Sequence, residues 1–214
     1  MDLAQVMQTN GTCRYYTAEP VSDEVLVGVL DAVRWAPSGG NRQPLSLVVV
    51  RDSATKRALQ ELYLPFWDAY LSGVKDGTVR LGIRDQRMLD AADHFAHHLF
   101  EMPVMVVVCA RLADVHPTDT ELGRLSIVGG ASIYPAVQNM LLAARAAGLG
   151  TALTTLLCGV EPQVKALLDI PEDVSTAAMV TLGWPAKPFP SKLHRRPLSE
   201  IAWSEKFGNP LVAD

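Results

Sequence analysis

Three runs of almost wholly apolar residues mark the chain, at positions 45–50, 104–109 and 176–182. They contain many β-branched residues and show no polar alternation, which is typical of strands that a sheet buries on both faces. A shorter stretch at 149–157 is also rich in β-branched residues and predicts an extended segment that leads into a loop. Together these runs predict a layered α/β core.

Apolar residues at helical spacing lie between these runs. One helical face carries Val25, Leu26, Val29, Leu30 and Val33. Ser22, followed by two acidic residues, predicts the start of this helix, and Pro37 predicts its end because proline disfavours helical geometry in the residue before it. Further helices are predicted at 3–10, 84–100, 132–147 and 162–168, with Gly148 closing the fourth of the five.

The region 54–102 alternates aromatic, charged and glycine-bearing segments, and we interpret it as a variable cover. Its aromatic cluster of Tyr63, Phe66, Trp67 and Tyr70 suits either stacking on a flat substrate or ordinary core packing. Later in the region, His94, His97 and His98 have the spacing of one helix face. No carboxylate completes a recognised metal signature there, so we predict a polar helix face or a dimer contact and no metal site.

The loop at 36–44, which reads Ala-Pro-Ser-Gly-Gly-Asn-Arg-Gln-Pro, separates the first long helix from the first apolar run. Its two glycines let backbone amides approach a ligand closely. Asn41 and Gln43 can each donate and accept hydrogen bonds, which suits the alternating edge of a flavin's pyrimidine ring. The alternative is that Ser38, Asn41 and Gln43 satisfy only the backbone of the loop.

Basic residues near both ends of the chain are candidates for binding an anion. Thr12 and Arg14 follow a break at Asn10-Gly11, and a hydroxyl and a guanidinium so placed can reach one cluster of anionic oxygens. The alternative is a capping threonine beside an ordinary surface arginine. Near the other end, Lys192, Arg195 and Arg196 form a compact basic cluster in an otherwise acidic chain.

Composition narrows the classes of protein. With 214 residues, 49% of them hydrophobic and 20% charged, the chain is long enough for one large core, and a single domain over 1–214 is expected. A formal net charge of -4 gives no general attraction to nucleic acid and favours small ligands. The three cysteines have no zinc or disulfide spacing, and no signal core or membrane-length apolar stretch occurs, so we expect a cytoplasmic protein.

Several enzyme signatures are missing. No GxGxxG follows a strand and no Walker loop occurs, so Rossmann dinucleotide and P-loop readings lose support. No GxSxG elbow or evident cysteine nucleophile is present either.

Ordered motifs along nearly the whole chain resemble the FMN-dependent nitroreductase family, which includes the iodotyrosine deiodinase-like flavoproteins. The 36–44 loop is the most specific of them. The other pieces, in order, are Thr12-Cys13-Arg14, Glu19-Pro20-Val21, Gln138-Asn139, Gly148-Leu149-Gly150-Thr151, Leu182-Gly183-Trp184-Pro185 and Arg195-Arg196-Pro197-Leu198.

The resemblance implies an α+β fold, a three-layer α/β/α sandwich with a mostly antiparallel central sheet. It implies a homodimer with FMN at the subunit interface and a C-terminal arm, about 186–214, that crosses to the partner. The implied FMN-binding residues are Asn10, Thr12, Arg14, Pro37, Ser38, Asn41, Gln43, Leu153, Thr154, Thr155, Arg195 and Arg196. Many relatives carry a basic pair at the positions of Asn10 and Gly11, so weaker FMN binding is expected here.

The implied chemistry is ping-pong. NADH or NADPH delivers hydride to flavin N5, and a planar nitroaromatic or quinone-type acceptor is then reduced in the same place. The flavin carries the reaction, so no catalytic side chain is nominated. The alternatives are a reductive dehalogenase or flavin-fragmenting enzyme on the same scaffold, and a non-catalytic flavin-binding protein. Leu153 interrupts the hydroxyl run of the deiodinase branch, which counts against dehalogenation.

Overall fold

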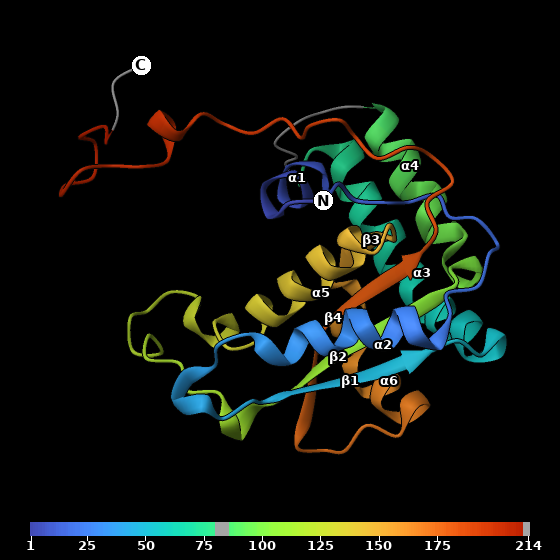
Figure 1. Ribbon diagram of the computed structural model, residues 1–214. Coiled ribbons are helices and arrows are strands. Elements are labelled where there is room, and N and C mark those ends of the chain that lie inside the picture. The colour runs from blue at the N-terminus through green and yellow to red at the C-terminus, as the bar shows by residue number, and fades with distance from the viewer. Residues whose placement is uncertain (80–85, 212–214) are drawn as a thin grey trace.

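A four-stranded antiparallel sheet forms the centre of the protein, in a computed structural model that describes residues 1–79 and 86–211 (Figure 1). The strands are β1 (Leu45–Val50), β2 (Val104–Arg111), β3 (Gly150–Thr154) and β4 (Val174–Gly183). Their order across the sheet is β1-β2-β4-β3, so β2 and β4 are the central pair. All four segments were predicted as extended from their apolar runs, and the observed strands extend the second and third runs by a few residues.

Alternate residues of β2 point into two different cores. Val104, Val106 and Val108 pack with residues of α2 (Asp23–Asp31) and α5 (Tyr134–Ala146). Met105 and Val107, between them, pack with residues of α3 (Ser53–Asp76), α4 (Gln86–His97) and α6 (Glu161–Leu168). Since successive strand residues face opposite sides of a sheet, these are the two faces, and the predicted three-layer α/β/α arrangement is confirmed.

The helix ends follow the expected chemistry. Ser22 accepts a hydrogen bond from the backbone N–H of Val25 at 3.3 Å, which caps α2 as predicted. Gly148 adopts the left-handed conformation (φ +86°) directly after α5, as predicted for a helix-closing glycine. The short N-terminal helix α1 spans Leu3–Thr9. None of the helices within 1–79 and 86–211 has both the length and the apolar character needed to cross a bilayer.

The interpretation of 54–102 missed one long helix. α3 runs unbroken for 24 residues with Pro65 inside it, although a proline in a helix interior usually breaks or kinks the helix. Leu59, Tyr63 and Trp67 are buried at a spacing of four residues and pack against the sheet. This burial stabilises the helix despite the proline, and it assigns Tyr63 and Trp67 to the core. The predicted helix at 84–100 is observed as α4, and its first two predicted positions lie outside the described residues.

The chain after β4 first follows the body and then leaves it (Figure 1). Ala186 donates a backbone hydrogen bond to the carbonyl of Tyr15 at 2.9 Å, and Leu193 donates one to the carbonyl of Gln8 at 2.7 Å. We call residues 186–193 the arm root and residues 194–211 the arm. The arm projects from the body and contains a short 3₁₀ turn, Leu198–Glu200, and an antiparallel bridge between Trp203 and Pro210.

Candidate functional site

The segment 12–16 lies along the edge of β3. Thr12 forms a parallel bridge with Thr151, and the N–H of Cys13 donates to the Thr151 carbonyl at 2.7 Å. The approach is so close that a Cβ at Gly150 would lie 2.6 Å from the Cys13 side chain. Only glycine fits at position 150, and this explains why the Gly148-Leu149-Gly150-Thr151 motif accompanies Thr12 and Arg14.

Tyr16 fastens the other end of this segment. Its hydroxyl donates to the carbonyl of Cys13 at 3.0 Å and lies 2.8 Å from Oγ1 of Thr181 in β4. Burial raises the pKa of the Tyr16 phenol well above its ordinary value, so the hydroxyl remains a donor throughout the physiological range. The backbone that carries Thr12 and Arg14 is therefore held by both β3 and β4.

A cavity of about 350 Å³ opens beside this segment. Its walls come from the 12–16 segment, α3, α4 and the end of β3. The lining residues are Thr12, Arg14, Tyr63, Trp67, Tyr70, Ala92, Phe95, Leu153, Thr154, Thr155 and Leu156. The structure thus brings five of the predicted site residues, Thr12, Arg14 and the three at 153–155, to one cavity and adds an aromatic wall.

Two polar contacts shape the aromatic wall. The Tyr63 hydroxyl lies 3.3 Å from Oγ1 of Thr154, which links α3 to the end of β3. Nε1 of Trp67 donates to Oδ1 of Asp93 at 2.8 Å, which links α3 to α4. The wall residues Tyr63 and Trp67 therefore belong to the core and also line the cavity, while stacking of the cluster on a flat substrate stays a prediction.

Arg14 is half-buried at this cavity and has no hydrogen-bond or ion-pair partner among the residues of 1–79 and 86–211. Thr12 is exposed beside it, and its hydroxyl is likewise without a partner in the same ranges. A free guanidinium next to a free hydroxyl is a donor set suited to a phosphate group.

The 36–44 loop is strained and lies elsewhere. Gly40, Asn41 and Gln43 all have left-handed backbone (φ +60°, +54° and +50°), which is uncommon for the two residues with side chains. Ser38 Oγ accepts a hydrogen bond from the Gln43 N–H at 3.0 Å, so at least one polar side chain of the loop satisfies the backbone of the loop itself. Strain of this kind is concentrated at functional sites.

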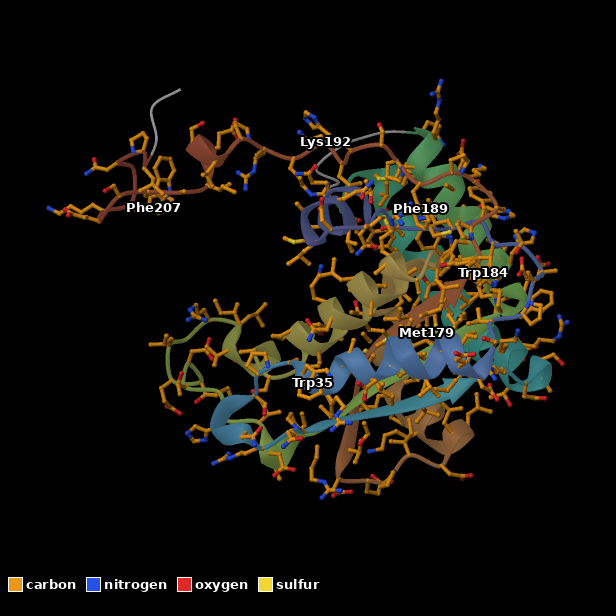
Figure 2. The ribbon with its side chains drawn as sticks, in the orientation of Figure 1. Trp35, Met179, Trp184, Phe189, Lys192 and Phe207 are labelled. Carbon is orange, nitrogen blue, oxygen red and sulfur yellow. The ribbon has the colours of Figure 1, made fainter. Side chains whose placement is uncertain are left out.

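A separate cavity of about 290 Å³ adjoins this loop, and Pro37, Ser38 and Gln43 line it. Neither Arg14 nor residues 153–155 reach this second cavity. Within one chain, the predicted ring-binding loop is therefore not joined to the predicted phosphate site. In Figure 2, Trp35, which shortly precedes the loop, lies well apart from Phe189 of the arm root.

The remaining predicted residues lie outside both cavities. Arg195 and Arg196 are exposed on the arm, and Arg195 donates only to the carbonyl of His194, at 2.8 Å, within the described residues. Asn10 ends α1 and does not line the cavity at Arg14. The structure does not bring these three residues to the other site residues of the same chain. Asn41, the fourth residue outside both cavities, lies on the 36–44 loop but does not line the cavity beside it.

Sequence reasoning missed a set of ring contacts beside the site. The ring of Tyr15 stacks on His94 with centroids 4.6 Å apart, and His94 stacks on His98 at 4.0 Å. The helical spacing of the histidines was visible, but Tyr15 is remote in sequence and gave no indication of the contact. Among the described residues, no group of three His, Cys, Asp or Glu side chains is placed to hold a metal.

Comparison with known proteins agrees with this geometry. A family model described as the nitroreductase family matches residues 11–184. The chain is 30% identical to an NADH dehydrogenase of Thermus thermophilus, over 88% of each chain. It is 27% identical to a 5,6-dimethylbenzimidazole synthase of Rhodospirillum rubrum, over 98% of this chain and 92% of the relative.

Among solved structures, a putative nitroreductase from Desulfovibrio desulfuricans, in complex with FMN, is similar with a TM-score of 0.66 and 26% identity. The similarity covers 97% of this chain and 98% of that one. The match of the family model over most of the sequence and the shared fold lead to one conclusion: the chain belongs to the nitroreductase family.

Proposed function

We propose that this protein is an FMN-dependent NAD(P)H oxidoreductase that reduces nitroaromatic or quinone-type acceptors. The observation that carries the proposal is the guanidinium of Arg14, unpaired among the residues that the structure describes, which shares one cavity with the Thr12 hydroxyl, an aromatic wall and residues 153–155. The similar Desulfovibrio protein is described as an FMN complex, and the Thermus relative is named an NADH dehydrogenase. Both names agree with a flavin enzyme that uses a nicotinamide donor.

The residues present fit FMN. A guanidinium and a hydroxyl suit the phosphate, which favours bidentate charged donors. A wall of Tyr63, Trp67 and Phe95 suits a flat ring system. Asn41 and Gln43 offer side-chain amides that match the polar edge of the pyrimidine ring, and both are exposed.

Bound FMN would supply the redox chemistry by taking two electrons from NADH or NADPH and passing them to the acceptor. The protein's own part is binding and orientation. Arg14 and Thr12 hold the phosphate, while the hydrogen bond between Tyr63 and Thr154 fixes the wall against the end of β3. The buried side chains of Tyr63, Trp67 and Phe95 exclude water from one side of the cavity.

A second copy of the chain completes the site in this proposal. The 36–44 loop and the cavity at Arg14 are separate in one chain, and the arm that carries Arg195 projects away from its own body. The arm exposes large apolar residues, including Phe207 with 92% of its surface exposed. An exposed apolar arm of this length is typical of a segment that packs on a partner. We therefore propose a homodimer in which the loop and arm of one subunit meet the Arg14 cavity of the other.

The visible spectrum of the purified protein, with and without added FMN, tests the proposal. We expect a yellow protein whose flavin absorbance is bleached anaerobically by NADH or NADPH and restored by a nitroaromatic or a quinone. A protein that takes up no FMN contradicts the proposal. A yellow protein that neither cofactor bleaches indicates a non-catalytic flavin-binding protein.

A second candidate is a flavin-fragmenting reaction, favoured by the similarity to 5,6-dimethylbenzimidazole synthase over nearly the full length of both chains. It is distinguished by the products formed when the FMN-loaded protein is reduced and then exposed to oxygen. Loss of the flavin with formation of a benzimidazole supports this candidate, and quantitative recovery of intact FMN supports the oxidoreductase. Release of halide from a halogenated phenol would instead indicate a dehalogenase.

A further inference from the structure

Three separate parts of the chain meet at the ring of Tyr15. Nζ of Lys187, from the arm root, lies 3.4 Å from the centroid of this ring. His94 of α4 stacks on the same ring at 4.6 Å with an interplanar angle of 19°, and His98 stacks on His94 at 4.0 Å and 27°. We call these four residues, Lys187, Tyr15, His94 and His98, the Tyr15 stack.

The Tyr15 stack is coupled to the candidate phosphate site through the backbone. Tyr15 directly follows Arg14, and its carbonyl accepts the hydrogen bond from Ala186 that begins the arm root. The Tyr15 ring and the Arg14 guanidinium are therefore carried by neighbouring residues of one short backbone segment, to which the arm root is also bonded.

Protonation chemistry makes the stack sensitive to charge. His98 Nδ1 lies 2.8 Å from the carbonyl oxygen of His94, and a carbonyl only accepts, so this nitrogen carries a hydrogen. His94 is half-buried, and the groups that face it are His98 and Glu101 from the turn after α4, Lys187 from the arm root, and Tyr15. Burial, with the charges of His98 and Lys187, lowers the pKa of His94, while Glu101 opposes this effect.

We propose that His94 is a positioning residue of the cofactor site: as a neutral imidazole on Tyr15 it holds the segment of Thr12 and Arg14 in place, and its protonation releases that segment. A protonated imidazole can also attract a phenol ring. Here the Tyr15 ring already carries the Lys187 ammonium, and His98 stacks on His94 at 4.0 Å. Like-charge repulsion therefore outweighs the attraction to the ring, so that protonation of His94 destabilises the stack. The part of the proposal that concerns FMN rests on the proposed function.

The first test needs no flavin. His94→Phe keeps an aromatic ring in the stack but cannot be protonated. His97→Phe is the matched control, because it removes an exposed histidine of the same helix that pairs with Asp93 at 3.5 Å and lies outside the stack. Thermal unfolding midpoints are measured from about pH 8 to about pH 5.5, a range that spans the ordinary histidine pKa. We expect the wild type and His97→Phe to lose stability on acidification, and His94→Phe to lose clearly less. Equal losses in all three proteins overturn the proposal.

The second test measures the dissociation constant of FMN over the same pH range, from the quenching of flavin fluorescence. We expect affinity to fall several-fold on acidification in the wild type and in His97→Phe, and to stay nearly constant in His94→Phe. If His94→Phe does not fold, Lys187→Met serves instead. Removing the ammonium removes part of the repulsion on protonated His94, so the unfolding midpoint and the FMN affinity must both depend less on pH than in the wild type. A wild-type profile in the folded variant overturns the proposal. Absence of FMN binding in every protein contradicts the proposed function, while the unfolding profiles still decide the role of His94.

Discussion

Gly150 packs so closely against the side chain of Cys13 that a Cβ at position 150 would lie 2.6 Å from both Cβ and Sγ of Cys13. Real Cβ atoms do not approach other atoms so closely, so a side chain at 150 must displace the 12–16 segment. This segment carries Thr12 and Arg14, and its N–H at Cys13 is bonded to the Thr151 carbonyl. The geometry of the candidate phosphate site therefore depends on a glycine in β3.

Gly150→Ala is expected to destabilise the protein by about 1–3 kcal/mol, the usual cost of overpacking, and to weaken FMN binding. Urea unfolding and flavin fluorescence titration measure the two effects. Gly28→Ala is the matched control, because a Cβ built at Gly28 meets nothing within 4 Å apart from its chain neighbours and the backbone of its own helix. Since alanine is the better helix former, Gly28→Ala is expected to stabilise α2 by up to about 1 kcal/mol without changing FMN affinity. Wild-type FMN affinity in Gly150→Ala would show that the geometry of the phosphate site does not depend on the close contact at Gly150.

Arg14→Ala is expected to weaken FMN binding by about 10- to 100-fold, because hydrogen bonds to charged groups contribute about 1.5–3 kcal/mol and 1.4 kcal/mol is a factor of ten. The dissociation constant is measured by fluorescence or by equilibrium dialysis. Arg111→Ala is the control, because Arg111 pairs with Asp173 at 3.2 Å and lines neither cavity. Unchanged flavin retention in Arg14→Ala would remove this guanidinium from the site.

Arg195→Ala tests the contribution of the partner subunit. Arg195 does not line the cavity of its own chain, so a loss of FMN affinity similar to that of Arg14→Ala is expected only if the arm reaches a second copy. Mixing Arg14→Ala with Arg195→Ala subunits is expected to restore one intact site per mixed dimer. Failure of the mixture to recover any FMN binding would count against a site shared between subunits.

Removal of the chain after Pro197 is expected to weaken self-association, since it deletes the exposed apolar residues Ile201 and Phe207. Sedimentation velocity over a range of protein concentrations measures the effect. Lys206→Ala is the matched control, because it changes a polar neighbour of Phe207 and leaves the apolar surface intact. A truncated protein that associates as tightly as the wild type would contradict the proposed role of the arm.

Asp119 gives a prediction for acid stability. Its carboxylate accepts hydrogen bonds from Ser126 Oγ at 2.6 Å, from the Ile127 N–H at 3.0 Å and from Arg124 at 2.7 Å. These bonds, that of Ser126 above all, lower the pKa of Asp119 to about 2. The folded pKa lies below the unfolded value of 3.8, so the stabilisation is complete above about pH 4 and is lost as the pH falls through 2.

Asp119→Asn should therefore lower the unfolding temperature at neutral pH and flatten its decline between about pH 4 and about pH 2. Glu121→Gln is the control, because it removes an exposed carboxylate from the same loop. The expectation is wrong if the two variants have the same pH profile as the wild type.

Local sequence predicted most of the elements. The apolar runs at 45–50, 104–109 and 176–182 all became strands, because a strand buried on both faces needs apolar residues throughout. Ser22 and Gly148 marked helix ends, because capping depends on one side chain or on one left-handed residue. α3 was missed because Pro65 and Gly73 resemble helix breaks, and only the burial of Leu59, Tyr63 and Trp67 on the sheet outweighs them.

The ordered motifs determined the family, since residue types at fixed positions along the chain do not depend on how the chain is packed. The tertiary structure decided which of these residues meet. It joined Thr12 and Arg14 to residues 153–155 through the close contact at Gly150, placed the 36–44 loop at another cavity, and stacked Tyr15 on His94. Such contacts come from the packing of segments far apart in sequence, where the order of the strands and the burial of whole faces decide the outcome, and single-sequence patterns carry no record of them.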